Sequence, residues 1–214
     1  MSVDVIYCGG GNKRFAEMAV SCGMKYGSRL PETVYLPLDF ADQDWKCPDR
    51  EAYMLALAEH RPEMATVLDW ERPEQLDEVL AWGEEAAQYV AVVVIVPKVP
   101  GRMWMIPRRI AGADVRLGYS VATEYGWTTV PVSHFRGWPV HLLGGSPDDQ
   151  LRMARYFDVK SVDGNYFQKA AIKGCRYWAG PGCWEGVSVG QDAPYRAFEC
   201  SCKNILQAWK VRQP

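Results

Sequence analysis

The stretch Val90-Ala-Val-Val-Val-Ile-Val96 is a continuous run of apolar, mostly β-branched residues that ends at Pro97-Lys98. Helices cover both faces of a parallel sheet, so a parallel strand at its centre is apolar on both sides. We therefore expect this run to be a central strand of an α/β fold. Even when it is extended to Tyr89–Pro97, the run is far shorter than the about 20 residues that a membrane-spanning helix needs, and no membrane segment is expected.

Strand-and-helix units lead up to this run from the start of the chain. The strands expected before it are Val3–Tyr7, Thr33–Leu36 and Met64–Leu68. Helices are expected over residues 12–24 and 48–61, and a third begins at Pro73, with Leu76, Val79, Leu80 and Ala87 on one face. This alternation predicts a parallel sheet with right-handed crossovers.

The spacing tightens after the central strand. We expect further strands at Asp114–Tyr119, Pro139–Leu143 and Val159–Val162, a helix from Ser146 to Tyr156, a loop over residues 174–190 and a C-terminal helix over about residues 194–212. The segments between the first of these strands are rich in glycine and proline and too short for full helices. Seven such strands form either an open, doubly wound sheet or a closed barrel. We favour a compact TIM-barrel-like (β/α) parallel barrel that is incomplete or irregular in its second half.

The composition fits one domain spanning residues 1–214. Hydrophobic residues make up 48% of the chain and charged residues 23%, which supplies a core and argues against disorder. The net charge of −2 provides no global positive field for holding a long nucleic acid. Seven cysteines, an odd number, and a start without a signal peptide predict a reducing compartment. We expect the cytoplasm, or the host cytoplasm if the chain is viral.

Carboxylates recur where the expected strands end. Asp39 or Asp42 follows the second strand, Asp69 ends the third and Asp163 ends the last. Each could simply cap a turn, but the carboxyl ends of parallel strands meet at one mouth, where the active sites of such folds form. Two facing carboxylates allow one to act as nucleophile and the other as general acid and base.

Two further features suggest contacts with phosphate. Gly144-Gly145 joins a strand to a helix start and would let a ligand approach backbone N–H groups. Four cations, Lys98, Arg102, Arg108 and Arg109, lie within twelve residues around Pro-Gly turns. They are either a local nucleic-acid contact or a solvated loop.

Cysteines raise the question of a metal. Cys175, Cys183, Cys200 and Cys202 could form a four-cysteine zinc site, but no C-x-x-C pair or nearby histidine supports one. We expect no cofactor and do not favour structural zinc. His141, within an expected strand, is interpreted as a satisfied core residue.

These strand-end residues resemble the tRNA-guanine transglycosylase (queuine tRNA-ribosyltransferase) superfamily, in particular the small phage enzymes that insert 7-deazaguanines into DNA. The resemblance covers about residues 33–168. Its strongest part is Leu142-Leu-Gly-Gly-Ser-Pro-Asp-Asp149 followed by Val159-Lys-Ser-Val-Asp163, which looks like the family's glycine turn, helix and nucleophile-bearing strand. Val67-Leu-Asp69 and Gly118-Tyr-Ser-Val121 are similar to strands that hold the guanine base.

The resemblance implies a role for each matching residue. Asp163 would be the nucleophile, and Asp42 the general acid and base, with Asp39 as the alternative. Asp69 would recognise the base edge, helped by Gly118, Tyr119, Ser120, Leu143, Gly144 and Gly145. The chain is much shorter than the tRNA enzymes and lacks their C-x-C-x-x-C zinc motif and their Asp-Ser-Gly-Gly-Phe stretch. These differences favour DNA over tRNA as the substrate.

The resemblance therefore implies a retaining base exchange, in which guanine in a nucleic acid is replaced by a 7-deazaguanine such as preQ0 through a covalent aspartyl-glycosyl intermediate. The target base must leave the stack, and Trp45, Trp70 or Tyr119 offers a surface for it. Two other classes stay open. One is a barrel enzyme acting on a small phosphorylated metabolite, and the other is a silent domain that binds nucleic acid or protein.

Overall fold

The computed structural model describes residues 3–9, 11–122 and 127–211. The strands are β1 (Asp4–Cys8), β2 (Lys25–Leu30), β3 (Phe40–Gln43), β4 (Met64–Thr66), β5 (Val92–Ile95), β6 (Arg109–Ile110), β7 (Ala113–Ser120), β8 (Pro139–Leu143), β9 (Asp158–Gly164), β10 (Arg176–Gly180) and β11 (Cys183–Gly186). The α-helices are α1 (Lys13–Cys22), α2 (Arg50–His60), α3 (Leu76–Ala86), α4 (Pro147–Met153), α5 (Tyr166–Gly174) and α6 (Ala193–Val211). Short 3₁₀ helices are η1 (Pro73–Gln75), η2 (Met103–Met105) and η3 (Val132–Phe135).

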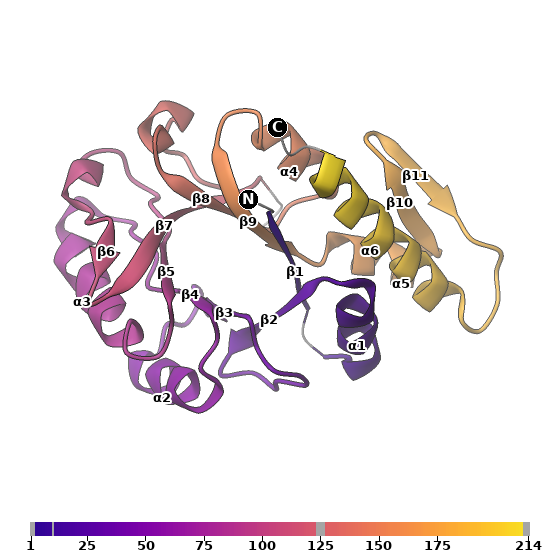
Figure 1. The fold of residues 1–214 in the computed structure, drawn as a ribbon, viewed down its shortest axis with the longest axis horizontal. Helices are drawn as coiled ribbons and strands as arrows, with labels where there is room; N and C mark the ends of the chain where they lie inside the picture. Colours follow the sequence, from indigo (N-terminus) through magenta and orange to yellow (C-terminus); the bar gives the residue numbers. More distant parts are fainter. Residues whose placement is uncertain (1–2, 10, 123–126, 212–214) are drawn as a thin grey trace.

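Eight parallel strands close into a barrel with helices around the outside (Figure 1). Nine strands of the described chain share one sheet in the order β5-β4-β3-β2-β1-β9-β8-β7-β6, and β5 also pairs with β7. The β5–β7 pairing closes the ring and leaves β6 outside it, as an antiparallel neighbour of β7. The structure confirms the predicted α/β barrel in its closed form. The irregular second half is also present, because β6, η2 and η3 stand where α-helices would follow β5 and β7.

The expected second strand at Thr33–Leu36 is wrong. These residues lie in the loop between β2 and β3, the two strands that the sequence did not reveal. Some interior positions of both strands are polar or small, such as Lys25 and Gly27 of β2 and Asp42 of β3, so the strands lack the apolar pattern of a buried strand. Gly27 of β2, for example, leaves space for Phe40 of β3, whose ring atom would lie 2.9 Å from an added Cβ. The loop expected over residues 174–190 is corrected as well, because it contains the antiparallel hairpin β10–β11.

The predicted helix ends differ from the observed ones by a few residues. Asn12 caps α1 as expected, and Gly23, in the left-handed region at φ 100°, ends it before Met24. The helix that begins after Ser146 ends at Met153 rather than Tyr156. The C-terminal helix begins at Ala193 and is described to Val211, whereas Arg212 lies outside the described residues.

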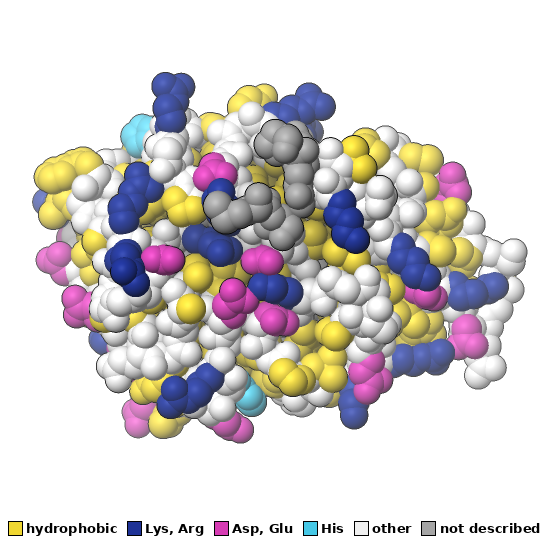
Figure 2. Space-filling view, in the orientation of Figure 1, with side chains coloured by type: hydrophobic (Ala, Val, Ile, Leu, Met, Phe, Trp, Pro, Cys, Tyr) yellow, Lys and Arg dark blue, Asp and Glu magenta, His cyan; other side chains and the backbone are white. Residues whose placement is uncertain are grey.

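An apolar layer fills the middle of the barrel. Its buried members are Ile6, Phe40, Met64, Val92, Val94 and Val96, and Cys8 and Leu143 pack against it. Below this layer, where the strands begin, the barrel is closed by charged residues: Asp4, Lys25, Asp39, Glu63 and Arg116. Figures 1 and 2 look onto this end, and Figure 2 shows acidic and basic side chains interspersed at its centre. The open mouth is therefore at the other end, where the strands finish.

The outer core lies between the barrel and its helices. Tyr7 points outward from β1 into a group of rings formed with Phe15, Phe167 and Phe198, whose centroids lie 4.7 to 6.0 Å apart. These rings hold α6 against α1 and α5, which is the arrangement seen in Figure 1. In the described part of the chain no helix is both long and apolar enough to cross a membrane.

Gly118 shows how tightly the interior is filled. A Cβ added there would lie 2.7 Å from Val96 Cγ2 and 2.8 Å from Leu143 Cδ1. We expect Gly118→Ala to lower the free energy of unfolding by about 1–3 kcal/mol because it overpacks the barrel. Gly180→Ala is the matched control, since a Cβ at Gly180 meets nothing within 4 Å. Urea denaturation measures both, and equal stability of the two variants would show that the interior is less tightly packed than described.

Candidate active site

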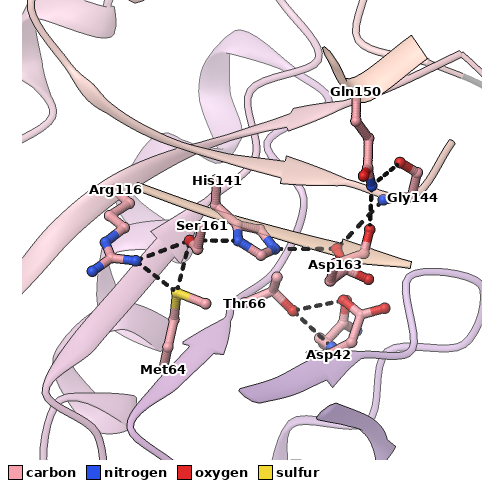
Figure 3. Close-up of polar contacts among 10 residues, drawn as sticks. Asp42, Met64, Thr66, Arg116, His141, Gly144, Gln150, Ser161 and Asp163 are labelled. Carbon is pink, nitrogen blue, oxygen red and sulfur yellow. Dashed lines mark hydrogen bonds and ion pairs between the residues drawn. The ribbon is translucent and has the colours of Figure 1, made fainter. Parts of the chain in front are cut away.

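Two carboxylates face the barrel mouth from opposite sides of β1 and β2. Asp42 lies on β3 and Asp163 on β9, and Figure 3 shows both side chains on the same side of His141. They are close enough that the charge of Asp163 raises the pKa of Asp42. Closure of the barrel thus brings together two of the aspartates that the sequence predicted to converge.

Asp163 is held by donors. Its Oδ1 atom lies 3.2 Å from His141 Nε2 and accepts from the Gly144 backbone N–H at 3.4 Å. The Gln150 side chain fixes the turn, because its Nε2 donates to the backbone oxygens of Asp163 at 2.7 Å and of Gly144 at 2.9 Å. Asp163 is 7% exposed, and these contacts fix the position of its carboxyl group.

The glycine pair explains how the backbone reaches Asp163. Gly144 and Gly145 have φ values of 63° and 80°, in the left-handed region that favours glycine. A side chain at Gly145 would also collide with Val121, at 2.5 Å from an added Cβ. The turn points the Gly144 N–H at Asp163, so this N–H already has a partner. The pair thus supports the carboxyl group, and the Gly144 N–H is not free for a phosphate.

The environment of Asp42 differs from that of Asp163 because it disfavours the ionised carboxylate. Burial, which is the largest effect, and then the charge of Asp163 raise its pKa to about 8, against the lowering effect of a 3.0 Å hydrogen bond from the Thr66 hydroxyl. Asp42 therefore carries a proton at neutral pH. Cys8, on β1 next to β9, has its pKa raised by burial and by the charges of Asp163 and Asp42, so its thiol is protonated as well.

A third carboxylate, Asp69, lies beyond the end of β4. Lys98, which follows β5, places its Nζ 3.6 Å from Asp69 Oδ2 and donates to Ser120 Oγ at 2.6 Å. Burial raises the pKa of Asp69 to about 6, although Lys98 opposes the shift. Asp69 and Lys98 together present an acceptor and a cationic donor side by side at the mouth.

Several other predicted site residues lie elsewhere. Asp39 lies where β3 begins, at the closed end, and its carboxylate accepts from the Tyr26 N–H at 2.9 Å. Tyr119 points outward, where its ring contacts Phe135 and Phe157. Neither lies at the mouth, so of Asp39 and Asp42 only Asp42 is positioned beside Asp163.

The expected cluster of four cations is not formed. Arg109 pairs with Asp114 where β7 begins, and Arg108 stacks on Trp138 and donates to the Gly137 carbonyl before β8 begins. Both lie toward the end of the barrel opposite the mouth. The four residues are neighbours in sequence, but the turn before β6 reverses the chain and carries the last two away from Lys98. Arg102 is exposed in the preceding turn, at φ 41°.

The aromatic residues expected at the mouth also differ in position. Trp70 is 1% exposed and donates from its indole to the Arg72 carbonyl, so it belongs to the core. Trp45, just beyond β3, is 45% exposed, and a base could stack on it. Among the described residues no group of three or more His, Cys, Asp or Glu side chains could hold a metal ion.

The sequence did not reveal the polar residues beneath the carboxylates. His141 was expected to be a satisfied core residue, and it is indeed buried, but its partner is Asp163. Ser161 and Arg116 continue the chain of contacts below it. A signal was present: Ser161 stands two residues before Asp163, and His141 two before Leu143. Residues two apart on a strand share a face, so each was placed to point into the same interior.

A protein-family model matches residues 16–210, and its description is "Family of unknown function (DUF6610)". The chain belongs to this family. No curated protein matches this DUF6610 chain. Two solved structures similar to it are phosphoribosylanthranilate isomerases.

The first of these structures, from Thermotoga maritima, is 16% identical with a TM-score of 0.40, and the match covers 79% of each chain. The second, in complex with reduced 1-(o-carboxyphenylamino)-1-deoxyribulose 5-phosphate, is 16% identical with a TM-score of 0.39. That match covers 95% of this chain and 98% of the other. At this identity the likeness concerns the fold and not the chemistry.

The raised pKa of Asp42 predicts how stability depends on pH. The folded chain keeps this proton up to a pH of about 8, whereas an unfolded Asp loses it near its ordinary pKa of about 4. Between these values the folded state binds more protons, so the free energy of unfolding falls as pH rises. Asp42→Asn has no carboxyl group to titrate at this position, so its free energy of unfolding should not show this decrease with pH. We expect the melting temperature of the variant, relative to wild type, to increase from about pH 5 to about pH 8.

Asp158→Asn is the control for this measurement, because Asp158 is an exposed carboxylate paired with Lys160. Its difference from wild type should stay constant over the same range. Parallel pH curves for wild type and Asp42→Asn would contradict a proton held on Asp42.

Proposed function

We propose that this protein is a base-exchange transglycosylase that replaces guanine in nucleic acid, DNA in preference to tRNA, with a 7-deazaguanine such as preQ0. The observation that carries the proposal is the contrast between the two carboxyl groups at the mouth. Asp163, which contacts His141 Nε2 and the Gly144 N–H, is assigned as the anion of the pair, and Asp42 keeps a proton through burial and the charge of Asp163. A pair of carboxyls in opposed protonation states supplies a nucleophile and an acid at the same pH.

In the first step Asp163 attacks the anomeric carbon of the target nucleoside, and the bond to guanine breaks. The electron pair of that bond stays on the base, and the base takes the proton of Asp42. The sugar passes through an oxocarbenium-like state, which the negative charge of Asp163 stabilises before the ester bond forms. Asp42 is then an anion beside a neutral glycosyl ester.

In the second step the incoming 7-deazaguanine gives its ring N–H proton to Asp42 and attacks the same carbon. The ester bond breaks, and Asp163 leaves as a carboxylate. Two inversions at one carbon retain the configuration. The step also restores Asp42 to its protonated form, so no further acid or base is needed between turnovers.

The third carboxylate fits recognition of the base. Asp69 would accept hydrogen bonds from the N1 and N2 groups of a guanine-like base, as the resemblance implies. Lys98 already offsets the charge of Asp69, at 3.6 Å, and Ser120 holds the ammonium group in place. The half-exposed Trp45 offers a stacking surface for a base that has left the duplex, at a cost of a few kcal/mol for unstacking.

The proposed reaction predicts incorporation of labelled preQ0 or guanine into DNA, and little into tRNA, by purified protein. Asp163→Asn should abolish incorporation, because the amide is not a nucleophile. Asp42→Asn should lower turnover by about 10²- to 10⁴-fold, the usual contribution of an acid-base group. Asp39→Asn is the matched control and should keep wild-type turnover, since Asp39 lies at the closed end of the barrel.

The other outcomes separate the remaining classes. Label in tRNA alone would reverse the choice of substrate. No label in either polymer would contradict base exchange. Nucleic-acid binding that is unchanged in Asp163→Asn, without turnover in wild type, would indicate a silent binding domain.

A further inference from the structure

A row of four polar residues runs through the barrel interior beneath the mouth (Figure 3). Arg116 Nη1 on β7 lies 2.9 Å from Ser161 Oγ on β9, and Ser161 Oγ lies 2.7 Å from His141 Nδ1 on β8. The other ring nitrogen, His141 Nε2, lies 3.2 Å from Asp163 Oδ1. His141 and Ser161 are 0% exposed. The His141 and Ser161 side chains therefore have to find their hydrogen-bond partners inside the barrel.

The direction of these bonds follows from what each group can donate. A guanidinium has donors only, so Ser161 Oγ accepts from Arg116. Ser161 then has one hydrogen left to give. Its acceptors are His141 Nδ1 at 2.7 Å and the weaker sulfur of Met64 at 3.7 Å. The nearer and stronger acceptor is Nδ1, which must then carry no proton.

The alternatives leave a buried group poorly paired. If His141 carried its single proton on Nδ1, the Nε2 lone pair would face the Asp163 carboxylate. If both nitrogens were protonated, Ser161 would accept from Arg116 and His141 at once and could give its hydrogen only to sulfur. Unpaired buried groups cost about 1–3 kcal/mol each, so the neutral Nε2–H form is favoured.

We propose that Arg116 and Ser161 are positioning residues that fix His141 as its neutral Nε2–H tautomer. In this tautomer the ring donates a hydrogen bond to Asp163 and does not accept one from it. Both hydrogen bonds to the carboxylate, from His141 and from Gly144, then fall on Oδ1. The side chain is held in one rotamer, and Oδ2 is the oxygen left to attack. This role in catalysis rests on the proposed function, whereas the proton position is a property of the resting protein.

The tautomer is measured directly by two-bond ¹H–¹⁵N correlation spectroscopy of the labelled protein near neutral pH. The chain has only 3 histidines, and the signals that disappear in His141→Gln belong to His141. We expect a protonated Nε2 and an unprotonated Nδ1. A proton on Nδ1 in wild type, in the neutral ring or the imidazolium, would overturn the proposal. This result needs no activity and no variant beyond the assignment.

Ser161→Ala tests the control of the tautomer. The variant removes the hydrogen given to Nδ1, so we expect the His141 Nδ1 resonance to shift and a fraction of the rings to carry a proton on Nδ1, while Asp163 still favours the Nε2–H form in the rest. Ser133→Ala, an exposed site in η3, is the matched control and should leave the His141 signals unchanged. An unchanged His141 spectrum in folded Ser161→Ala would also overturn the proposal.

Activity gives the last readout. Ser161→Ala should lower kcat by about 10–100-fold, as loss of a residue that orients a reactive group does, with KM nearly unchanged. Predicted tautomers together with no base exchange by wild type would support the proton arrangement and contradict only the proposed function.

Discussion

Pairing between β5 and β7 is the constraint on which the rest of the structure depends. Residues Val92–Ile95 align in parallel with Asp114–Leu117 and close the ring. Once the ring is closed, every strand ends at the same mouth, and every second side chain points inward. Asp42 and Asp163 then face one interior although two other strands separate β3 from β9. An open sheet would leave them apart.

The interior changes character along the barrel axis. Charged residues at the closed end are paired with one another, as Lys25 is with Asp4 at 3.2 Å. An apolar layer separates them from the mouth, where Asp42 is largely desolvated and forms no salt bridge among the described residues, although the charge of Arg29 partly offsets the rise of its pKa. Removing a carboxyl group such as that of Asp42 from water lowers the stability of the fold. Positions where a protein keeps such a destabilising residue are typically functional. The buried row from Arg116 to Asp163 crosses the apolar layer and supports the reactive end from below.

Much of the fold was predictable from the sequence because most strands are apolar runs. The segment Val90–Val96 predicted a buried parallel strand, and β5 lies within it. β2 and β3 were missed because Gly27 and Asp42 occupy interior positions that apolar residues normally fill. The site was predictable where a carboxylate ends a strand, as at Asp163. It was not predictable where the chain reverses direction, as it does before Arg109. Nor was it predictable where the role of a buried polar residue, such as His141, depends on a partner from another strand.

The most direct test of the account is a site-resolved titration of the two carboxyl groups by ¹³C NMR, with assignments from Asp42→Asn and Asp163→Asn. The account predicts that at neutral pH Asp163 is a carboxylate and Asp42 is protonated, with the Asp42 signal changing at a pH of about 8. Two ionised carboxylates at neutral pH would contradict the division into nucleophile and acid, and the proposed exchange would lose its physical basis.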